Sequence, residues 1–406
     1  MMSADQASPI ASSSSPSSFW YPVFAGLCAS LVGIGLARFA YTPLIPPLIQ
    51  AHWFAAAAVV YLGAANLAGY LVGALLGRPI AARLSNRHTL RLMMLLVCAS
   101  FLACAFPVSV SWFFGWRFLS GVAGGSIMVL VAATLLPHIA PARRGMASGA
   151  IFFGLGLGIA ASGTLVPLLL NLGLRATWIG LGILALLLTA ASWSGWPMAA
   201  AAPGQPPAGT AGRAAPSVAI LYLQYALMAV GLVPTMVFLV DFIARGLGAG
   251  AHLASLFWIV YGVGAIAGPL SYGWLGDRLG PRDGMRLVLL VQVLALAGIY
   301  LSSNYVLIGA LTIIIGSFPP GIVPLMLARM HGMLPHDVAA QNRGWSRITV
   351  IFAASQALVG YAYSAIFNAS GGNYRLLFLI AAVGLALALL SEMALAFLRS
   401  KTQRHG

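Results

Sequence analysis

The chain has 406 residues, of which 61% are hydrophobic and only 7% are charged. A soluble domain keeps about a quarter of its residues charged, so this composition excludes an ordinary soluble protein. The net charge of +15 does not indicate a nucleic-acid partner. The arginines collect in short loops between hydrophobic segments, where the positive-inside rule explains them.

Apolar stretches of about 20 residues recur from Trp20 to Leu398, and each is long enough to cross the hydrocarbon core of a bilayer. They are rich in Leu, Ala, Ile, Val, Met and Gly and lack the polar/apolar alternation of a membrane barrel. The sequence therefore predicts an all-α membrane protein. We expect helices over residues 20–49, 54–77, 92–108, 111–136, 146–171, 176–197, 217–244, 252–275, 286–302, 304–330, 344–368 and 375–398.

Two segments of low complexity divide the chain. The first 18 residues are rich in Ser and Pro and lack Lys and Arg, which favours a disordered tail over a signal peptide. Pro, Gly and small residues fill 199–217, a composition typical of a flexible linker. We predict a tail at 1–18, a six-helix bundle at 19–198, a linker at 199–217, a second six-helix bundle at 218–398 and a tail at 399–406.

The basic residues predict the orientation of the chain. With the N-terminus inside, the loops on that side hold most of the arginines, and we count Arg329 among them. The opposite loops hold only Arg175, Arg245 and Arg375. This asymmetry predicts a multi-pass protein of the bacterial inner membrane with both termini in the cytoplasm.

The two halves repeat each other. Pro137-His138 followed by Arg144-Gly145 recurs as Pro335-His336 followed by Arg343-Gly344. Duplicated six-helix halves suit a transporter that works by alternating access around a site between them.

Glycines recur every fourth residue in three of the predicted helices, which predicts close approach of helix backbones. These glycines are Gly69, Gly73 and Gly77; Gly154 and Gly158; and Gly264 and Gly268.

The run Gly273-Trp-Leu-Gly-Asp277-Arg278-Leu-Gly280-Pro-Arg282 resembles the loop signature of the major facilitator superfamily between helices 8 and 9. The resemblance covers the chain after residue 18 and implies the major facilitator fold, with about 12 transmembrane helices in two pseudo-symmetric six-helix bundles. In that family the motif ties helix ends together in one conformational state. The resemblance thus implies a conformational latch; the alternative is a solvated loop whose charges only set topology.

The corresponding loop of the first half departs from the signature, because Ala82 stands for the aspartate and Ser85 for the glycine. Helix 1, from Gly33 to Pro46, and helix 7, from Phe238 to Leu247, resemble the YbfB/YjiJ-type branch of the family. The resemblance to that branch implies a transporter but does not indicate its substrate.

Charges inside the membrane are expensive and indicate functional positions. Arg38, Arg117 and Asp241 are the strongest cases. We hypothesise that Arg38 and Arg117 bind an anionic organic substrate, because a guanidinium holds a carboxylate bidentately. The alternative is that one arginine pairs permanently with Asp241 and holds helices together.

Tyr41 and Tyr261 are the aromatic candidates for the substrate site. Aromatic and amide side chains in membrane helices are also common as interfacial anchors or interhelical contacts. That second interpretation covers the whole set Tyr41, Asn66, Tyr225, Trp258, Tyr261 and Gln356.

Asp241 is the candidate for proton coupling, because burial raises the pKa of a carboxyl group towards neutrality. It could instead serve as a gate or a strut between helices 7 and 1. We expect Glu392 to reach interfacial water at the inner end of helix 12. The remaining candidates, Asp277, Asp283 and Asp337, are expected in loops.

The sequence holds no nucleophile constellation or phosphate-binding loop, and its three cysteines lack metal-ligand spacing. We therefore expect no enzyme activity, no cofactor and no metal. The predicted function is a monomeric, proton-coupled transporter of a small organic anion, with the lipid bilayer as its surroundings and no nucleic-acid partner. The alternatives are proton-antiport efflux of drugs or metabolites, and a non-transporting membrane receptor or scaffold.

Overall fold

The computed structural model describes residues 17–140, 143–197, 216–333 and 338–404, and these residues form helices and no strand. Within them, eleven helical segments are long and apolar enough to cross a membrane. The longest, Gly250–Leu301, has 52 residues and bends at Gly280, where φ is +80°. Each part of it is long enough for one crossing, so the prediction of an all-α membrane protein with about 12 crossings is confirmed.

The first half contains the elements α1 (Ser17–Ser30), η1 (Leu31–Leu36), α2 (Ala37–Phe39), η2 (Thr42–Leu44), α3 (Ile45–Gln50), α4 (Ala56–Leu84), α5 (Asn86–Cys104), α6 (Val110–Leu135), η3 (Leu136–His138), α7 (Arg144–Leu170) and α8 (Leu174–Ala191). The second half contains α9 (Pro216–Val237), α10 (Leu239–Asp241), η5 (Phe242–Gly246), α11 (Gly250–Leu301), α12 (Tyr305–Met333), α13 (Val338–Ala369) and α14 (Tyr374–Arg404). Most of the predicted tail at 1–18 and of the linker at 199–217 lies outside the described residues.

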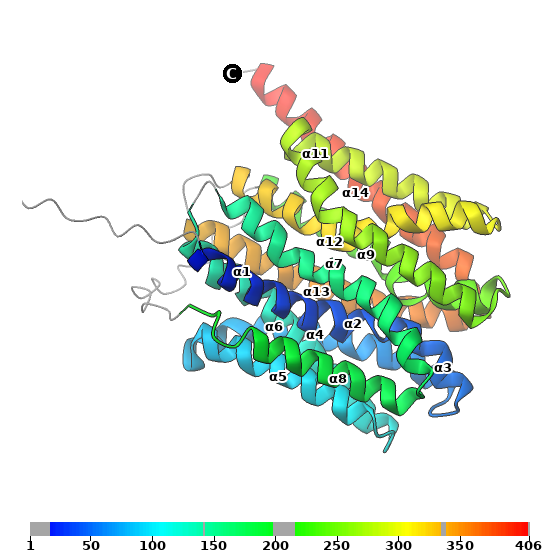
Figure 1. Cartoon of the computed structure of the whole chain (residues 1–406). Helices are drawn as coiled ribbons and strands as arrows, with labels where there is room; N and C mark the ends of the chain where they lie inside the picture. The colour runs from blue at the N-terminus through cyan, green and yellow to red at the C-terminus, as the bar shows by residue number, and fades with distance from the viewer. Residues whose placement is uncertain (1–16, 141–142, 198–215, 334–337, 405–406) are drawn as a thin grey trace, which may run out of the picture.

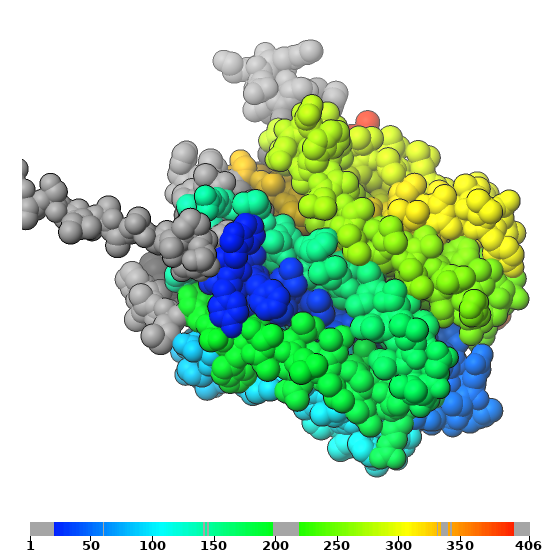
Figure 2. Space-filling view, in the orientation of Figure 1, coloured from blue at the N-terminus to red at the C-terminus, as the bar shows by residue number. Residues whose placement is uncertain are grey.

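The helices form two bundles, with the N-terminal bundle in the lower part of Figure 1 and the C-terminal bundle in the upper part. The bundles meet where α7 packs on α11 and α4 packs on α13, and their side chains are in contact along the face shown in Figure 2. We call the end of the molecule with the start of α1 and the turn at Gly280 the tail end. The opposite end, where α3 and α4 connect, is the distal end.

Two crossings are broken close to the centre of the molecule. The first changes from α-helix to a π-helical turn, η1, and then to a 3₁₀ turn, η2, where Pro43 has no N–H to donate. The seventh breaks at Phe238, between α9 and α10. The released carbonyl groups take side-chain donors, because Ala37 accepts from Arg117 and Met236 accepts from Thr42. Such breaks are tolerated in a membrane where the backbone is buried in protein.

The turns at the tail end are tighter than the sequence predicted. The loop expected between helices 2 and 3 reduces to Ser85, and the loop between helices 8 and 9 reduces to Gly280; both residues have positive φ. Asp277 and Asp283 therefore lie in the helical segments on either side of Gly280, and their assignment to a loop was wrong. The predicted position of Asp337 lies outside the described residues.

The tenth crossing, α12, is continuous across Pro319, Pro320 and Pro324 and extends to Met333. Arg329, which the topology argument counted as a loop residue, is inside this helix and is 3% exposed. The residue lies near the end of the predicted helix 304–330, and its assignment to a loop was wrong because its side chain packs between helices instead of reaching water.

The glycine ladders pack helices within each bundle. A Cβ atom at Gly73 of α4 would lie 2.0 Å from a carbonyl oxygen of α6, and one at Gly268 of α11 would lie 2.1 Å from a carbonyl oxygen of α12. These are the corresponding helix pairs of the two halves. Between the bundles, a Cβ at Gly262 would lie 2.6 Å from a backbone atom of α7. Only glycine permits these backbone approaches.

Candidate functional site

Arg38 lies in the broken part of the first crossing and connects the two bundles. Its Nη2 donates a hydrogen bond of 2.9 Å to Oε1 of Gln356 on α13. Its guanidinium also lies 5.3 Å from the ring centre of Tyr70 on α4, within the range of a cation–π interaction. The partner across the interface is thus a neutral amide, which does not compensate the charge of the arginine.

Arg117 projects from α6 towards the same break and is only 2% exposed. Its Nη1 donates to the carbonyl oxygen of Ala37 at 2.7 Å, and its guanidinium lies 4.4 Å from the ring centre of Tyr41. On α4, Asn66 donates to the hydroxyl of Ser120 at 2.9 Å, which fixes α4 against this part of α6. Arg117 therefore binds the peptide group that directly precedes Arg38.

Three of the four predicted substrate-binding residues, Arg38, Tyr41 and Arg117, line one cavity of about 20 Å³. That space holds about one water molecule, so the bundles must move apart before an organic molecule can enter. The other lining residues are Phe39, Thr42, Ile45, Gly63, Asn66, Leu67, Met236 and Val237.

Tyr261, the fourth predicted residue, does not line this cavity. Its ring stacks on Trp258 with the ring centres 4.7 Å apart, and Trp258 in turn lies 6.3 Å from the ring of Phe39. Tyr261 therefore belongs to an aromatic layer beside the cavity on the C-terminal bundle.

The cavity carries positive charge without a compensating carboxylate. No acidic side chain is among its lining residues, and the Nε atoms of Arg38 and Arg117 have no hydrogen-bond partner within the part of the chain that the structure describes. Taking a charge out of water costs several kcal/mol per ion after relaxation. An anion between the bundles would offset that cost, because it supplies both the opposite charge and the missing acceptors.

Among the described residues, three hydrogen bonds join the bundles in the middle and the distal half of the molecule. Besides Arg38 to Gln356, Thr42 donates to the carbonyl of Met236 at 2.8 Å, and Trp258 donates to the hydroxyl of Ser162 at 3.0 Å. The rings of Tyr61 and Tyr361 also meet across the interface, with centres 6.4 Å apart. This conformation is therefore closed on the distal side of the cavity.

Asp241, the predicted coupling residue, is 3% exposed and lies in the distal part of the seventh crossing. Its carboxylate accepts from Arg245, one turn along the same crossing, and from the hydroxyl of Tyr374 at 2.7 Å. The alternative that Asp241 pairs with one of the two central arginines is not what the structure shows. Arg245, assigned to a loop, takes that place, and Arg38 and Arg117 donate to neutral acceptors instead.

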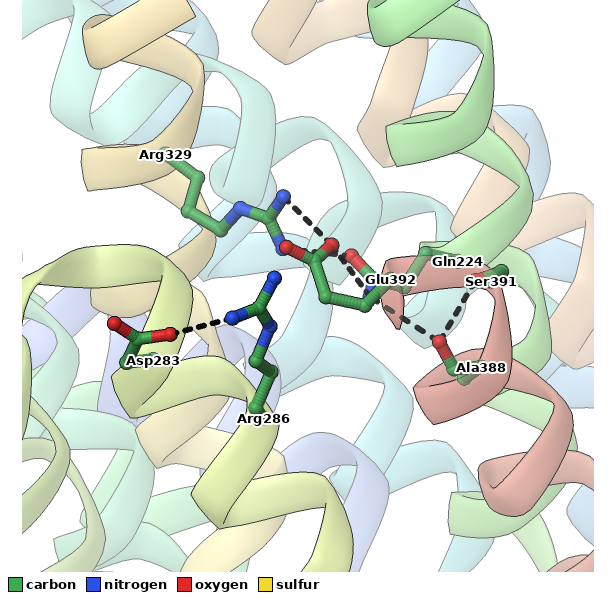
Figure 3. Close-up of polar contacts among 7 residues, drawn as sticks. All are labelled: Gln224, Asp283, Arg286, Arg329, Ala388, Ser391 and Glu392. Atoms are coloured by element: carbon green, nitrogen blue, oxygen red, sulfur yellow. Dashed lines mark hydrogen bonds and ion pairs between the residues drawn. The ribbon is translucent and has the colours of Figure 1, made fainter. Parts of the chain in front are cut away.

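Glu392 was expected to reach interfacial water, and that expectation was wrong. Its side chain is 2% exposed and forms an ion pair of 2.9 Å with Nη2 of Arg329. Gln224 of α9 joins the pair, and Figure 3 shows the three side chains pointing towards one another from α9, α12 and α14. Sequence reasoning missed Arg329 and Gln224; a charge five residues after Pro324 inside an apolar stretch was the available signal.

The predicted latch residues surround the turn at Gly280. Asp277, Arg278 and Arg282 are exposed, and Arg278 lies over the ring of Trp274, 5.5 Å from its centre. Asp277 makes no ion pair or hydrogen bond within the described ranges. Gly273 has open space beside it. Asp277 therefore makes no latch contact in this conformation.

Comparison with known proteins gives a consistent picture of the fold. A family model described as "Uncharacterised MFS-type transporter YbfB" matches residues 30–393. The crystal structure of a D-xylose–proton symporter superposes with a TM-score of 0.71 at 16% identity, covering 92% of this chain and 97% of that one. The 4-hydroxybenzoate transporter PcaK of Acinetobacter baylyi is 35% identical over 100 residues, which are 24% of this chain and 22% of that protein. The chain thus aligns with about a fifth of the length of that curated relative.

Proposed function

Because the chain belongs to the family of YbfB-type major facilitator transporters, and so is a transporter rather than an enzyme, we propose that it carries a small organic anion by alternating access. One observation carries this proposal: Arg38 and Arg117 line a central cavity that has no acidic lining residue. Hydrogen bonds to charged groups contribute about 1.5–3 kcal/mol each, so two guanidinium groups are sufficient to select an anion over a neutral solute.

A carboxylate is the anion that this site fits best. Arg38 gives one of its donors to a neutral amide, Gln356, and a carboxylate accepts the planar fork of a guanidinium with two parallel hydrogen bonds. Binding would therefore exchange the Arg38–Gln356 bond for a charge-assisted one. Since Gln356 is on the other bundle, the same exchange would release one of the bonds that close the distal side.

An aromatic carboxylate is the first compound to test. The ring of Tyr41 lies against Arg117 and lines the cavity together with Phe39, so a flat substrate would find aromatic rings beside its charged group. The partial relative from Acinetobacter baylyi is a 4-hydroxybenzoate transporter, which makes 4-hydroxybenzoate and benzoate suitable probes.

The charges at the tail end support an orientation of the chain in the membrane. Arg278, Arg282 and Arg286 lie there, and the positive-inside rule places such residues in the cytoplasm. We therefore propose a bacterial inner-membrane protein with its distal end facing the periplasm. The conformation described here is then closed to the periplasm, as a carrier must be before or after it releases its substrate to the cytoplasm.

We propose Asp241 as a proton-coupling residue on the distal side. Its carboxylate is buried, whereas the side chain of its partner Arg245 is 46% exposed and can turn towards water. Without that partner, a buried carboxylate favours the protonated form. Asp241→Asn should abolish proton-driven accumulation and keep exchange of labelled for unlabelled substrate; unchanged accumulation would remove Asp241 from the mechanism.

Thermal unfolding of the purified protein with a panel of acids, amines and drugs tests the proposed substrate class. A ligand at 100 times its Kd stabilises the folded state by about 2.7 kcal/mol. Benzoate-like anions should raise the Tm of the wild type and of Arg175→Ala, an exposed arginine outside the site. They should not raise the Tm of Arg38→Ala or Arg117→Ala. Stabilisation by cationic drugs alone would contradict the proposal and favour efflux of basic compounds.

A further inference from the structure

A second buried charge cluster lies in the tail half of the C-terminal bundle, away from the central cavity. Nη2 of Arg329 on α12 is 2.9 Å from Oε2 of Glu392 on α14, and Nη1 donates to Oε1 of Gln224 on α9 at 2.9 Å. The amide of Gln224 donates in turn to Oε2 of Glu392 and to the carbonyl of Ala388, both at 3.3 Å. Figure 3 shows this closed triangle, which we call the Arg329–Glu392 cluster.

Glu392 is one of two buried carboxylates in the described part of the chain, Asp241 being the other. The exposed fractions of the Arg329 and Glu392 side chains are only 1% and 2%. Breaking such a pair by removing one partner leaves an uncompensated buried charge and costs about 3–5 kcal/mol. A buried carboxylate that loses its cation avoids most of that cost by taking up a proton.

Arg329 also borders solvent-accessible space at the tail end. It lines a pocket of about 370 Å³ together with the turn residues from Leu279 to Asp283 and the end of α12 at Gly332 and Met333. The pocket therefore reaches to within one side chain of the Glu392 carboxylate. A proton or an anion that enters it meets Arg329 first.

The helix that carries Arg329 has a weak point just before it. Pro319, Pro320 and Pro324 lie inside α12, and each removes the hydrogen bond to the carbonyl four residues earlier. The part of α12 after Pro324 is therefore less firmly joined to the rest than in an ordinary helix. A swing of this segment would carry Arg329 away from α14, while Glu392 and Gln224 would stay on the helices α14 and α9, which pack against each other.

We propose that Glu392 is a proton-binding site of the transport cycle, which takes up a proton when Arg329 leaves it and releases that proton when the pair re-forms. The proton arrives with the anion from the side of the central cavity and binds Oε2 of Glu392, while Arg329 stays a guanidinium. It leaves to water in the tail-end pocket. Only the cause of the departure rests on the proposed function: an anion that has passed from the central cavity to this pocket draws Arg329 to itself. One proton then enters the protein for each anion held.

The other arginines named on the elements around Glu392 are paired elsewhere or exposed. The described part of α9 contributes the neutral Gln224, and α12 contributes Arg329. From α11, Arg286 points towards the cluster in Figure 3 and is itself paired with Asp283 at 2.7 Å. From α13, Arg343 and Arg347 are exposed. Within the described residues, Glu392 thus has a single direct cation, Arg329.

Infrared spectroscopy tests the proton site without any substrate. In Arg329→Gln at neutral pH we expect the carbonyl stretch of a protonated carboxylic acid, which is absent from the wild type and from the double variant Arg329→Gln/Glu392→Gln. If Arg329→Gln shows no such band, Glu392 stays ionised without its partner and the proposal is wrong. Asp241→Asn in the Arg329→Gln background is the matched control and should keep the band.

Transport in proteoliposomes tests the role of the proton in the cycle, with labelled 4-hydroxybenzoate as the probe. Glu392→Gln keeps the hydrogen bonds of the cluster and so should fold. Its proton-driven accumulation should fall to the level without a gradient, while exchange persists. Accumulation equal to that of the wild type would overturn the proposal. If the wild type does not transport 4-hydroxybenzoate, the proposed substrate fails, and the infrared result alone decides about Glu392.

Discussion

Two groups of arginines inside the described part of the molecule differ in their partners and in the helices that they join. In the central cavity Arg38 and Arg117 donate to an amide and to a backbone carbonyl, with no carboxylate in the lining. In the tail half of the C-terminal bundle, Arg329 donates to Gln224 and pairs with Glu392. The first cluster joins the two bundles, and the second joins three helices of one bundle.

The difference shows how the same side chain serves two purposes. An arginine that pairs with a buried carboxylate has its charge compensated, and removing either partner destabilises the fold. An arginine that has only neutral acceptors lacks a compensating negative charge. An external anion would supply that charge and lower the free energy of the site. The central cluster is therefore suited to bind a solute, and the Arg329–Glu392 cluster is suited to respond to a movement.

The largest effect on stability is expected at the Arg329–Glu392 cluster. Glu392→Ala leaves Arg329 buried without its carboxylate and should lower the free energy of unfolding by about 3–5 kcal/mol. Ser391→Ala, one residue away on the same helix, removes only a local hydrogen bond and should change stability little. Thermal or denaturant unfolding measures both. Equal stability of the two variants would mean that the pair does not hold α12, α14 and α9 together.

Substitution of a central arginine should change the affinity for anions more than the stability of the fold. Arg117→Ala removes a charged donor and should weaken binding of a benzoate-like anion by about 1.5–3 kcal/mol, which is roughly 10-fold to 150-fold in Kd. Because it also removes a buried charge without a carboxylate, we do not expect a loss of stability as large as for Glu392→Ala. Isothermal titration and unfolding on the same preparation compare the two quantities. A loss of stability without a loss of affinity would reverse the comparison.

Gln356→Glu would place a carboxylate beside Arg38 and so compensate its charge. A carboxylate at this position would pair with Arg38 in the way that Glu392 pairs with Arg329. We expect the protein without ligand to gain about 1 kcal/mol of stability and to lose its stabilisation by anions. Gln356→Asn, which keeps the amide, is the control. Anion binding that survives in Gln356→Glu would show that Arg38 does not contact the substrate.

The smallest effect is expected at Asp277 of the predicted latch. Asp277 is exposed and disengaged in this conformation, so Asp277→Asn should leave both the Tm and the affinity for anions unchanged. A slower transport rate in proteoliposomes would then assign the residue to another conformation of the cycle. A lowered Tm would instead mean that Asp277 stabilises the conformation described here.

Much of the site could be predicted because charge in an apolar helix is a strong signal. Arg38, Arg117 and Asp241 were identified from this rule alone, and the cavity contains the first two. Glu392 and Arg329 lie near the ends of the predicted helices 375–398 and 304–330, and they were assigned to the water interface because hydropathy does not show which side chains meet between helices. Tyr261 was placed in the site from its helix, whereas its ring faces an aromatic neighbour, Trp258, beside it.

The sequence by itself determined the class of the protein, the two halves and the residues too costly to bury without a purpose, because composition and apolar length act locally along the chain. Only the tertiary structure decided which charges meet. Gln356 reaches Arg38 from 318 positions away, and Arg329, rather than a lipid headgroup or water, meets Glu392. Pairing depends on which helix faces which across a bundle, and that arrangement is set by packing between helices far apart in the chain.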